Sequence, residues 1–161
     1  MQALYPWIVF VHVLAAFGFA LAHGVSAFAA FSMRARRQPE QVTLLLDLSR
    51  LSSSAMYVSL VVLILAGIGA GVMGGWFGQL WIWAAIGVLV AVLVAMFALA
   101  SPYYARVRMA VGQAPFGRGP APEPVSAAEL AALLDSRRPE VITVVGTIGL
   151  AALLWLMIFK P

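Results

Sequence analysis

The chain has 161 residues, of which 63% are hydrophobic and only 10% are charged. A soluble domain carries about 25% charged residues because its surface must face water, so this composition excludes an ordinary soluble domain and indicates a surface that faces lipid. Cysteine is absent from the sequence, which excludes disulfides, iron–sulfur clusters and thiolate metal sites. The formal net charge is +4. The basic residues behind it lie almost entirely in two segments, so we interpret them as evidence about membrane topology.

Four uncharged apolar segments follow one another along the chain. They comprise residues 7–33, 56–72, 80–100 and 141–159. About 20 helical residues cross a 30 Å hydrocarbon core, and in lipid each backbone N–H and C=O must be paired within the segment. We therefore predict an all-α fold, a single membrane domain over 1–161 in which four helices form an up-down bundle.

The segments between the spans have a pattern of their own. Residues 42–53 read VTLLLDLSRLSS, an amphipathic stretch expected either to lie at the interface or to extend the second span. A Gly/Pro-rich linker is predicted at about 112–125. It is followed by a capping box from Ser126 to Glu129, which opens a short amphipathic helix that Pro139 ends or kinks.

A short echo links the two loops, since LLDLSR at 45–50 resembles LLDSR at 133–137. Each copy lies just before a span. A duplicated two-helix hairpin would explain the echo, and so would coincidence among Leu-rich amphipathic helices, which we consider the better explanation.

Basic residues predict the orientation of the bundle. Nine of the ten Lys and Arg residues lie between the first and second spans or between the third and fourth, and the tenth is Lys160. The positive-inside rule places both basic loops in the cytoplasm and both termini on the non-cytoplasmic side. The loops are expected to meet anionic lipid head groups there. The aromatic anchors lie towards the opposite face: Tyr5, Trp7, Trp76, Trp81, Trp83 and Trp155.

The only two histidines, His12 and His23, both lie in the first span. Eleven residues make three helical turns plus about 20°, so the two side chains share a face, roughly 16 Å apart along the axis. The rest of this face is mainly small: Ala16, Phe19, Ser26, Ala27 and Ala30. The opposite face is bulky and suited to lipid: Phe10, Leu14, Phe17, Leu21 and Phe28.

Ionisable groups inside a membrane are candidates for function, and imidazole is a common ligand of haem iron and of copper. His12 and His23 are therefore predicted as cofactor or metal ligands, at separate sites because of their spacing. Methionines at matching depths are candidates for a second ligand: Met73 and Met157 near His12, and Met56 and Met96 near His23. In the alternative interpretation each histidine makes an interhelical hydrogen bond, to Ser59, Tyr57, Thr143 or Thr147.

Glycines concentrate in the second span, where Gly67 and Gly71 have the GxxxG spacing that lets helices approach closely. Helix packing is the predicted role, although the same small residues would leave room for a flat macrocycle. The spans contain no acid or base apart from histidine, which disfavours a proton-coupled transporter. Enzyme motifs such as phosphate loops and nucleophile elbows are absent, so no enzymatic activity is predicted, nor is nucleic-acid binding.

Three stretches carry a family resemblance: HVLAAFGFALAHGVSAFAAFSMRARR, MYVSLVVLILAGIGAG and RPEVITVVGTIGLAALLWLMIFKP. The chain resembles bacterial integral-membrane proteins of unknown function related to the CopD-like (copper resistance D) group, and more distantly HemJ-type proteins. The resemblance implies a four-helix protein of the bacterial inner membrane with a link to haem or copper, and His12 matches the first-span histidine. HemJ-type proteins also carry a basic residue within their spans, which this chain lacks.

Two functions follow as expectations. The first is a membrane protein that binds haem b or copper through first-span histidines and serves electron transfer or metal and haem handling. The second is a non-catalytic structural or accessory subunit of a homo-oligomer or a larger membrane complex.

Overall fold

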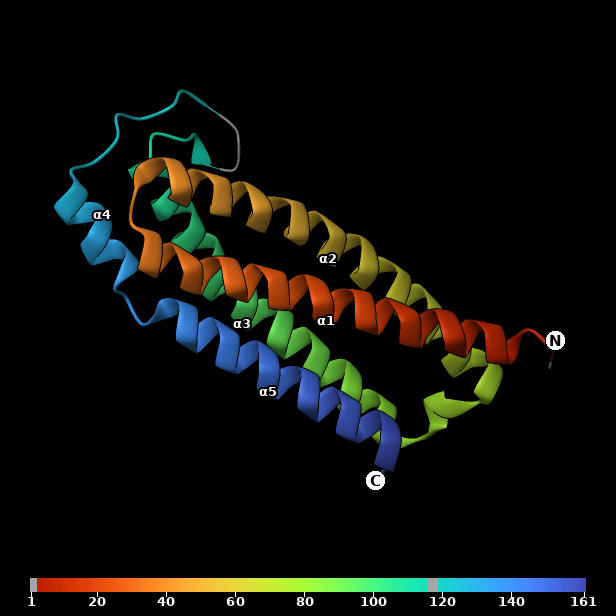
Figure 1. Cartoon of the computed structure of the whole chain (residues 1–161). Helices are drawn as coiled ribbons and strands as arrows, with labels where there is room; N and C mark the ends of the chain where they lie inside the picture. The colour runs from red at the N-terminus through yellow and green to blue at the C-terminus, as the bar shows by residue number, and fades with distance from the viewer. Residues whose placement is uncertain (1–2, 116–118) are drawn as a thin grey trace.

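The chain is described from a computed structural model that covers residues 3–115 and 119–161. Within these residues the structure is mostly helical and contains no β-strand. In chain order the helices are α1 (Tyr5–Arg36), α2 (Pro39–Gly74), the 3-10 turn η1 (Trp76–Gly78), α3 (Leu80–Ala110), α4 (Ala127–Leu134) and α5 (Arg138–Phe159) (Figure 1). Four helical segments in this part of the chain are long and apolar enough to cross a membrane, and each contains one predicted span. The chain is a multi-pass helical membrane protein.

Helix α2 settles the two alternatives for the amphipathic stretch at 42–53. It is one continuous helix of 36 residues, roughly 54 Å long at 1.5 Å per residue, so the stretch extends the second span beyond the hydrocarbon core. The other alternative, a separate amphipathic helix lying at the interface, is wrong. The turn between α1 and α2 comprises only Arg37, in the left-handed region with φ 37°, and Gln38. Pro39 then starts α2 at its first turn, where a missing N–H costs nothing.

Helix α4 begins as predicted. The Ser126 hydroxyl accepts a hydrogen bond from the Glu129 backbone, while the Glu129 carboxylate accepts one from the Ser126 N–H at 3.1 Å. Its end differs from the prediction, because α4 stops at Leu134 and Pro139 lies in the first turn of α5. Proline favours that position, since its fixed φ suits a helix start. The described part of the linker at 112–125 is mostly irregular.

Replacing Ser126 with alanine should destabilise α4 by about 1 kcal/mol, the usual cost of losing an N-cap. Hydrogen–deuterium exchange of the α4 amides in detergent should accelerate accordingly. Glu129→Gln provides the control, because glutamine also closes a capping box and should preserve protection. Equal exchange in the unsubstituted protein and Ser126→Ala would contradict the role of the cap.

The long helices associate as two pairs. Helix α1 packs along α2 and α3 packs along α5, whereas α2 and α3 barely touch. Consecutive long helices run in alternating directions, and both chain ends lie at the end of the molecule opposite α4 (Figure 1). The pairs are drawn together near α4 and diverge towards the chain ends (Figure 1).

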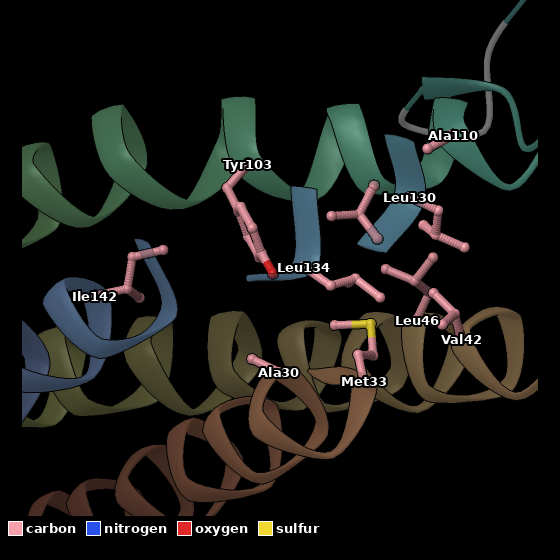
Figure 2. Close-up of a cluster of buried hydrophobic side chains, with 10 residues drawn as sticks. Ala30, Met33, Val42, Leu46, Tyr103, Ala110, Leu130, Leu134 and Ile142 are labelled. Carbon is pink, nitrogen blue, oxygen red and sulfur yellow. The ribbon is translucent and has the colours of Figure 1, made fainter. Parts of the chain in front are cut away.

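The buried core sits at the α4 end rather than in the middle of the bundle. Its members are Ala30, Met33, Val42, Leu46, Tyr103, Val107, Ala110, Leu130, Leu134 and Ile142. These residues come from all five α-helices, and Figure 2 shows Leu130 and Leu134 of α4 reaching in between α2 and α3. Helix α4 therefore fastens the two helix pairs together.

The two copies of the loop echo lie at equivalent places around this core. Leu46 and Leu134 are both fully buried in it. The following aspartates pair across the helix pairs: Asp47 with Arg108 of α3 at 3.8 Å, and Asp135 with Arg37, just after α1, at 2.6 Å. The two segments are therefore alike in their position around the core as well as in sequence.

Aromatic anchors gather at the opposite end, as the sequence indicates. The Trp76 indole N–H donates to the Tyr5 hydroxyl at 3.2 Å, and the Trp76 and Trp81 ring centroids lie 5.9 Å apart. The ammonium of Lys160 lies 4.3 Å from the Trp76 centroid, a cation–π contact that joins the C-terminus to η1.

Candidate functional site

Helix α1 has the two faces that its sequence predicts. The aromatic and leucine face points outward, with Leu21 71% exposed and Phe28 66% exposed on the bare bundle. The histidine face points inward, and Ala30 on this face is 2% exposed. Both histidines therefore lie between helices, but their surroundings differ.

His12 is a packing residue between α1 and α2. Its Nδ1 donates a hydrogen bond to the backbone carbonyl of Leu63 at 2.9 Å. The ring lies against Gly67, where an added Cβ would come within 3.0 Å of the imidazole Cε1. The predicted interhelical hydrogen bond therefore exists, although the partner differs from the four predicted side chains. Gly67 has the predicted packing role, because its missing side chain leaves room for the His12 imidazole.

Gly71, the second glycine of the GxxxG pair, packs against η1 and α3 instead of α1. An added Cβ there would lie 2.9 Å from the Phe77 ring and 3.4 Å from Ile82. Gly67 therefore makes room for the His12 ring and Gly71 for the Phe77 ring. Side chains of the protein itself fill the space beside both glycines. No room for a macrocycle is left beside Gly67.

His23 lies against α5, with Gly146 as the residue that admits its ring. A Cβ at Gly146 would overlap the imidazole Nε2. This nitrogen is buried and has no hydrogen-bond partner within residues 3–115 and 119–161. Thr143 lies nearby, lining the same cavity as His23, but does not bond to Nε2. Buried polar atoms are nearly always paired, so an unpaired nitrogen calls for an explanation.

The cavity beside His23 has a volume of about 700 Å³ and is bounded by α1, α2, α3 and α5. It exists because α2 and α3 barely touch, which leaves the space between the helix pairs open. Its walls are mainly apolar side chains such as Leu60, Leu93 and Phe97. A volume of this size is typical of ligand and cofactor sites.

Met56 and Met96 line the same cavity as His23, so three of the six predicted ligand candidates come together. His12, Met73 and Met157 line neither this cavity nor the smaller one described below. The described part of the chain holds no group of three or more His, Cys, Asp or Glu side chains that could bind a metal. Of the ligands predicted from the sequence, Met56 and Met96 are therefore the ones that share the cavity with His23.

The α4 end of the cavity is polar and basic. Ser26 and Ser49 share a hydrogen bond of 3.0 Å there, and the side chains of Arg50 and Arg108 form part of the wall. The same two arginines also line a second cavity of about 240 Å³, together with Asp47 and Gln113. They therefore separate the apolar cavity from a hollow formed by the loop residues.

The two arginines are held differently. The Arg108 guanidinium donates to the Leu46 carbonyl at 2.8 Å and to the Gln113 side chain at 2.7 Å, with Asp47 at 3.8 Å. The Arg50 guanidinium makes no ion pair or hydrogen bond to any residue that the structure describes, and its side chain is exposed.

The sequence reasoning missed both arginines as site residues because it counted them only as evidence of orientation. Helical spacing offered a signal. Arg50, Ser53, Ser54, Tyr57 and Leu60 occupy positions i, i+3, i+4, i+7 and i+10 on one face of α2, and all five line the cavity.

No family model, curated protein or solved structure matches this chain. The resemblance to the CopD-like and HemJ-type proteins therefore stays a prediction, and the case for function rests on the site itself.

Proposed function

We propose that this protein binds haem b in the cavity between its two helix pairs, with His23 as an axial ligand, and that it serves electron transfer or haem handling in the membrane. One observation carries the proposal. The cavity brings together a histidine with an unpaired buried nitrogen, two methionines, apolar walls and a basic end. An amphipathic, dicarboxylate macrocycle has matching chemistry.

Haem suits this site better than copper does. The macrocycle supplies four iron ligands, so the protein needs to provide only one or two. A copper site must draw most of its ligands from the protein, and besides His23 the cavity lining offers two of the soft ligands that copper favours, the thioethers of Met56 and Met96.

His23 can ligate without losing any hydrogen bond at Nε2. That nitrogen packs against Gly146, so His23 would hold the iron after its ring turns towards the cavity. Because Nε2 has no partner among the described residues, the turn costs only packing contacts. Met56 or Met96 would hold the iron together with His23. Bound haem would contribute one-electron redox chemistry.

The same proposal includes the orientation. Nine of ten basic residues belong to the loop side, which supports cytoplasmic loops in contact with anionic lipid and non-cytoplasmic termini. We place the protein in the bacterial inner membrane on the strength of the family resemblance.

A structural role is the second candidate, and His12 is the observation that favours it. Its bond to Leu63 and its fit against Gly67 serve the α1–α2 interface alone. An accessory subunit of a homo-oligomer or a larger membrane complex would need such packing and no cofactor. We assign His12 to packing under either function.

A spectrum of the purified protein tests the proposal. Expressed with added haem precursor and purified in detergent, the protein should show a Soret band and a stoichiometric amount of haem b by the pyridine haemochrome assay. Metal analysis of the same sample should find iron and no copper. A folded preparation without a Soret band, from cells supplied with both haem and copper, would contradict haem binding and leave the structural role.

A further inference from the structure

A ligand in this cavity must also fit its basic end, where the side chains of Arg50 and Arg108 form part of the wall. His23 and Ser26 are three residues apart on α1, a rise of roughly 5 Å towards α4. Ser26 bonds to Ser49, the neighbour of Arg50, at 3.0 Å. Arg50 follows Ser49 on α2, which runs away from the loops, so its backbone stands roughly 3 Å closer to the loops than that of His23, in the wall of the same cavity.

Of the two arginines at this end, Arg108 has an acidic partner and Arg50 has none among the described residues. Asp47 is the acidic residue that lines the adjoining smaller cavity, and it pairs with Arg108. Arg108 is further held by Leu46 and Gln113, so its guanidinium is fixed in place. Arg50 has no ionic partner among the described residues, which leaves one guanidinium free to meet an anion. A guanidinium matches a carboxylate with two parallel hydrogen bonds.

We infer that Arg50 binds a carboxylate of the tetrapyrrole and so sets which way the ligand enters the cavity. This inference rests on the proposed haem function and names the residue that orients the bound haem. The carboxylate edge of the ligand points to the loops, the apolar edge lies between Leu60, Leu93 and Phe97, and Arg108 adds a fixed positive charge behind Arg50.

Titration with haem b and with haem dimethyl ester tests the inference. The ester keeps the iron and the macrocycle but carries no carboxylate charge. The unsubstituted protein, Arg50→Gln, Arg50→Lys and the control Arg106→Gln are each placed in phosphatidylcholine nanodiscs, which contain no net anionic head group. Arg106 is exposed on the same side of the bundle and lines neither cavity.

Arg50→Gln should weaken haem b binding about tenfold, the effect of losing one charge-assisted pair, and should leave ester binding unchanged. Arg50→Lys keeps the charge but loses the two parallel hydrogen bonds, so its affinity for haem b should fall between those of Arg50→Gln and the unsubstituted protein, whereas Arg106→Gln should retain full affinity. Equal losses for haem b and its ester, or no loss for either, would overturn the role of Arg50 while the haem function stands. Failure of the unsubstituted protein to bind either ligand would instead overturn the haem function, and this inference with it.

Discussion

Replacing His23 with leucine should abolish the Soret band of the purified protein, whereas the same substitution at His12 should preserve it. Of the two histidines only His23 lines the cavity, and leucine offers no lone pair to iron. His12 instead lies against Gly67 and bonds to Leu63, both on α2, and does not line the cavity. The pair is a matched comparison because both residues belong to one helix and receive the same replacement.

Absorbance spectra and haem content should be compared in preparations with equal monodispersity. The His12→Leu protein should lose about 0.6 kcal/mol of stability, the average for an interhelical hydrogen bond in membranes. Loss of the chromophore in His12→Leu but not in His23→Leu would reverse the assignment of the two residues. Retention of haem in both single variants would exclude either histidine as a necessary ligand.

Replacing Leu46 with alanine should lower the free energy of unfolding by about 2–5 kcal/mol, the usual cost of removing a buried leucine side chain from a core. Leu46 is 0% exposed, at the point where α4 fastens the helix pairs. The expected effect is large because the core of this protein is small and lies at one end. Stability can be measured by denaturant titration in mixed micelles, with tryptophan fluorescence or circular dichroism as the signal.

Leu44→Ala is the matched control. Leu44 lies two residues away on the same helix and is 70% exposed, so its replacement should change the free energy of unfolding by less than about 0.5 kcal/mol. Similar effects of the two substitutions would mean that the core at the α4 end does not hold the bundle together.

The position of this core also explains why a cavity exists. Small residues let α1 pack closely on α2, and Gly149 similarly admits Val92 between α5 and α3. Between the pairs, contact is concentrated near α4 and slight elsewhere. The cavity at His23 begins next to the core residue Ala30 and extends away from α4, where the pairs no longer meet.

Sequence reasoning was most successful where a single helix decides the outcome. The spans, the lipid face of α1 and the capping box at Ser126 all depend on local periodicity or on residues within one turn, and the structure contains each of them. It was less successful at helix ends. Pro139 was expected to end or kink the helix that begins after Ser126, whereas that helix stops at Leu134 and Pro139 lies in the first turn of α5.

The site shows the same division. Helical spacing placed His12 and His23 on one face, and depth placed Met56 and Met96 near His23. Which neighbour each histidine meets was beyond the sequence, because the answer depends on whether α2 or α5 lies opposite each turn of α1. Gly67 admits one ring and Gly146 the other, and only the second position opens onto a cavity.

Composition and charge by themselves determined that this is a helical membrane protein with its basic residues on one side, since lipid tolerates only apolar segments whose backbone is internally paired. The tertiary structure decided that the four helices form two pairs joined near α4. Pairing is set by the fit of small residues against specific side chains many residues away. The separation of the pairs is what gives His23, rather than His12, a cavity with Arg50 at its loop end.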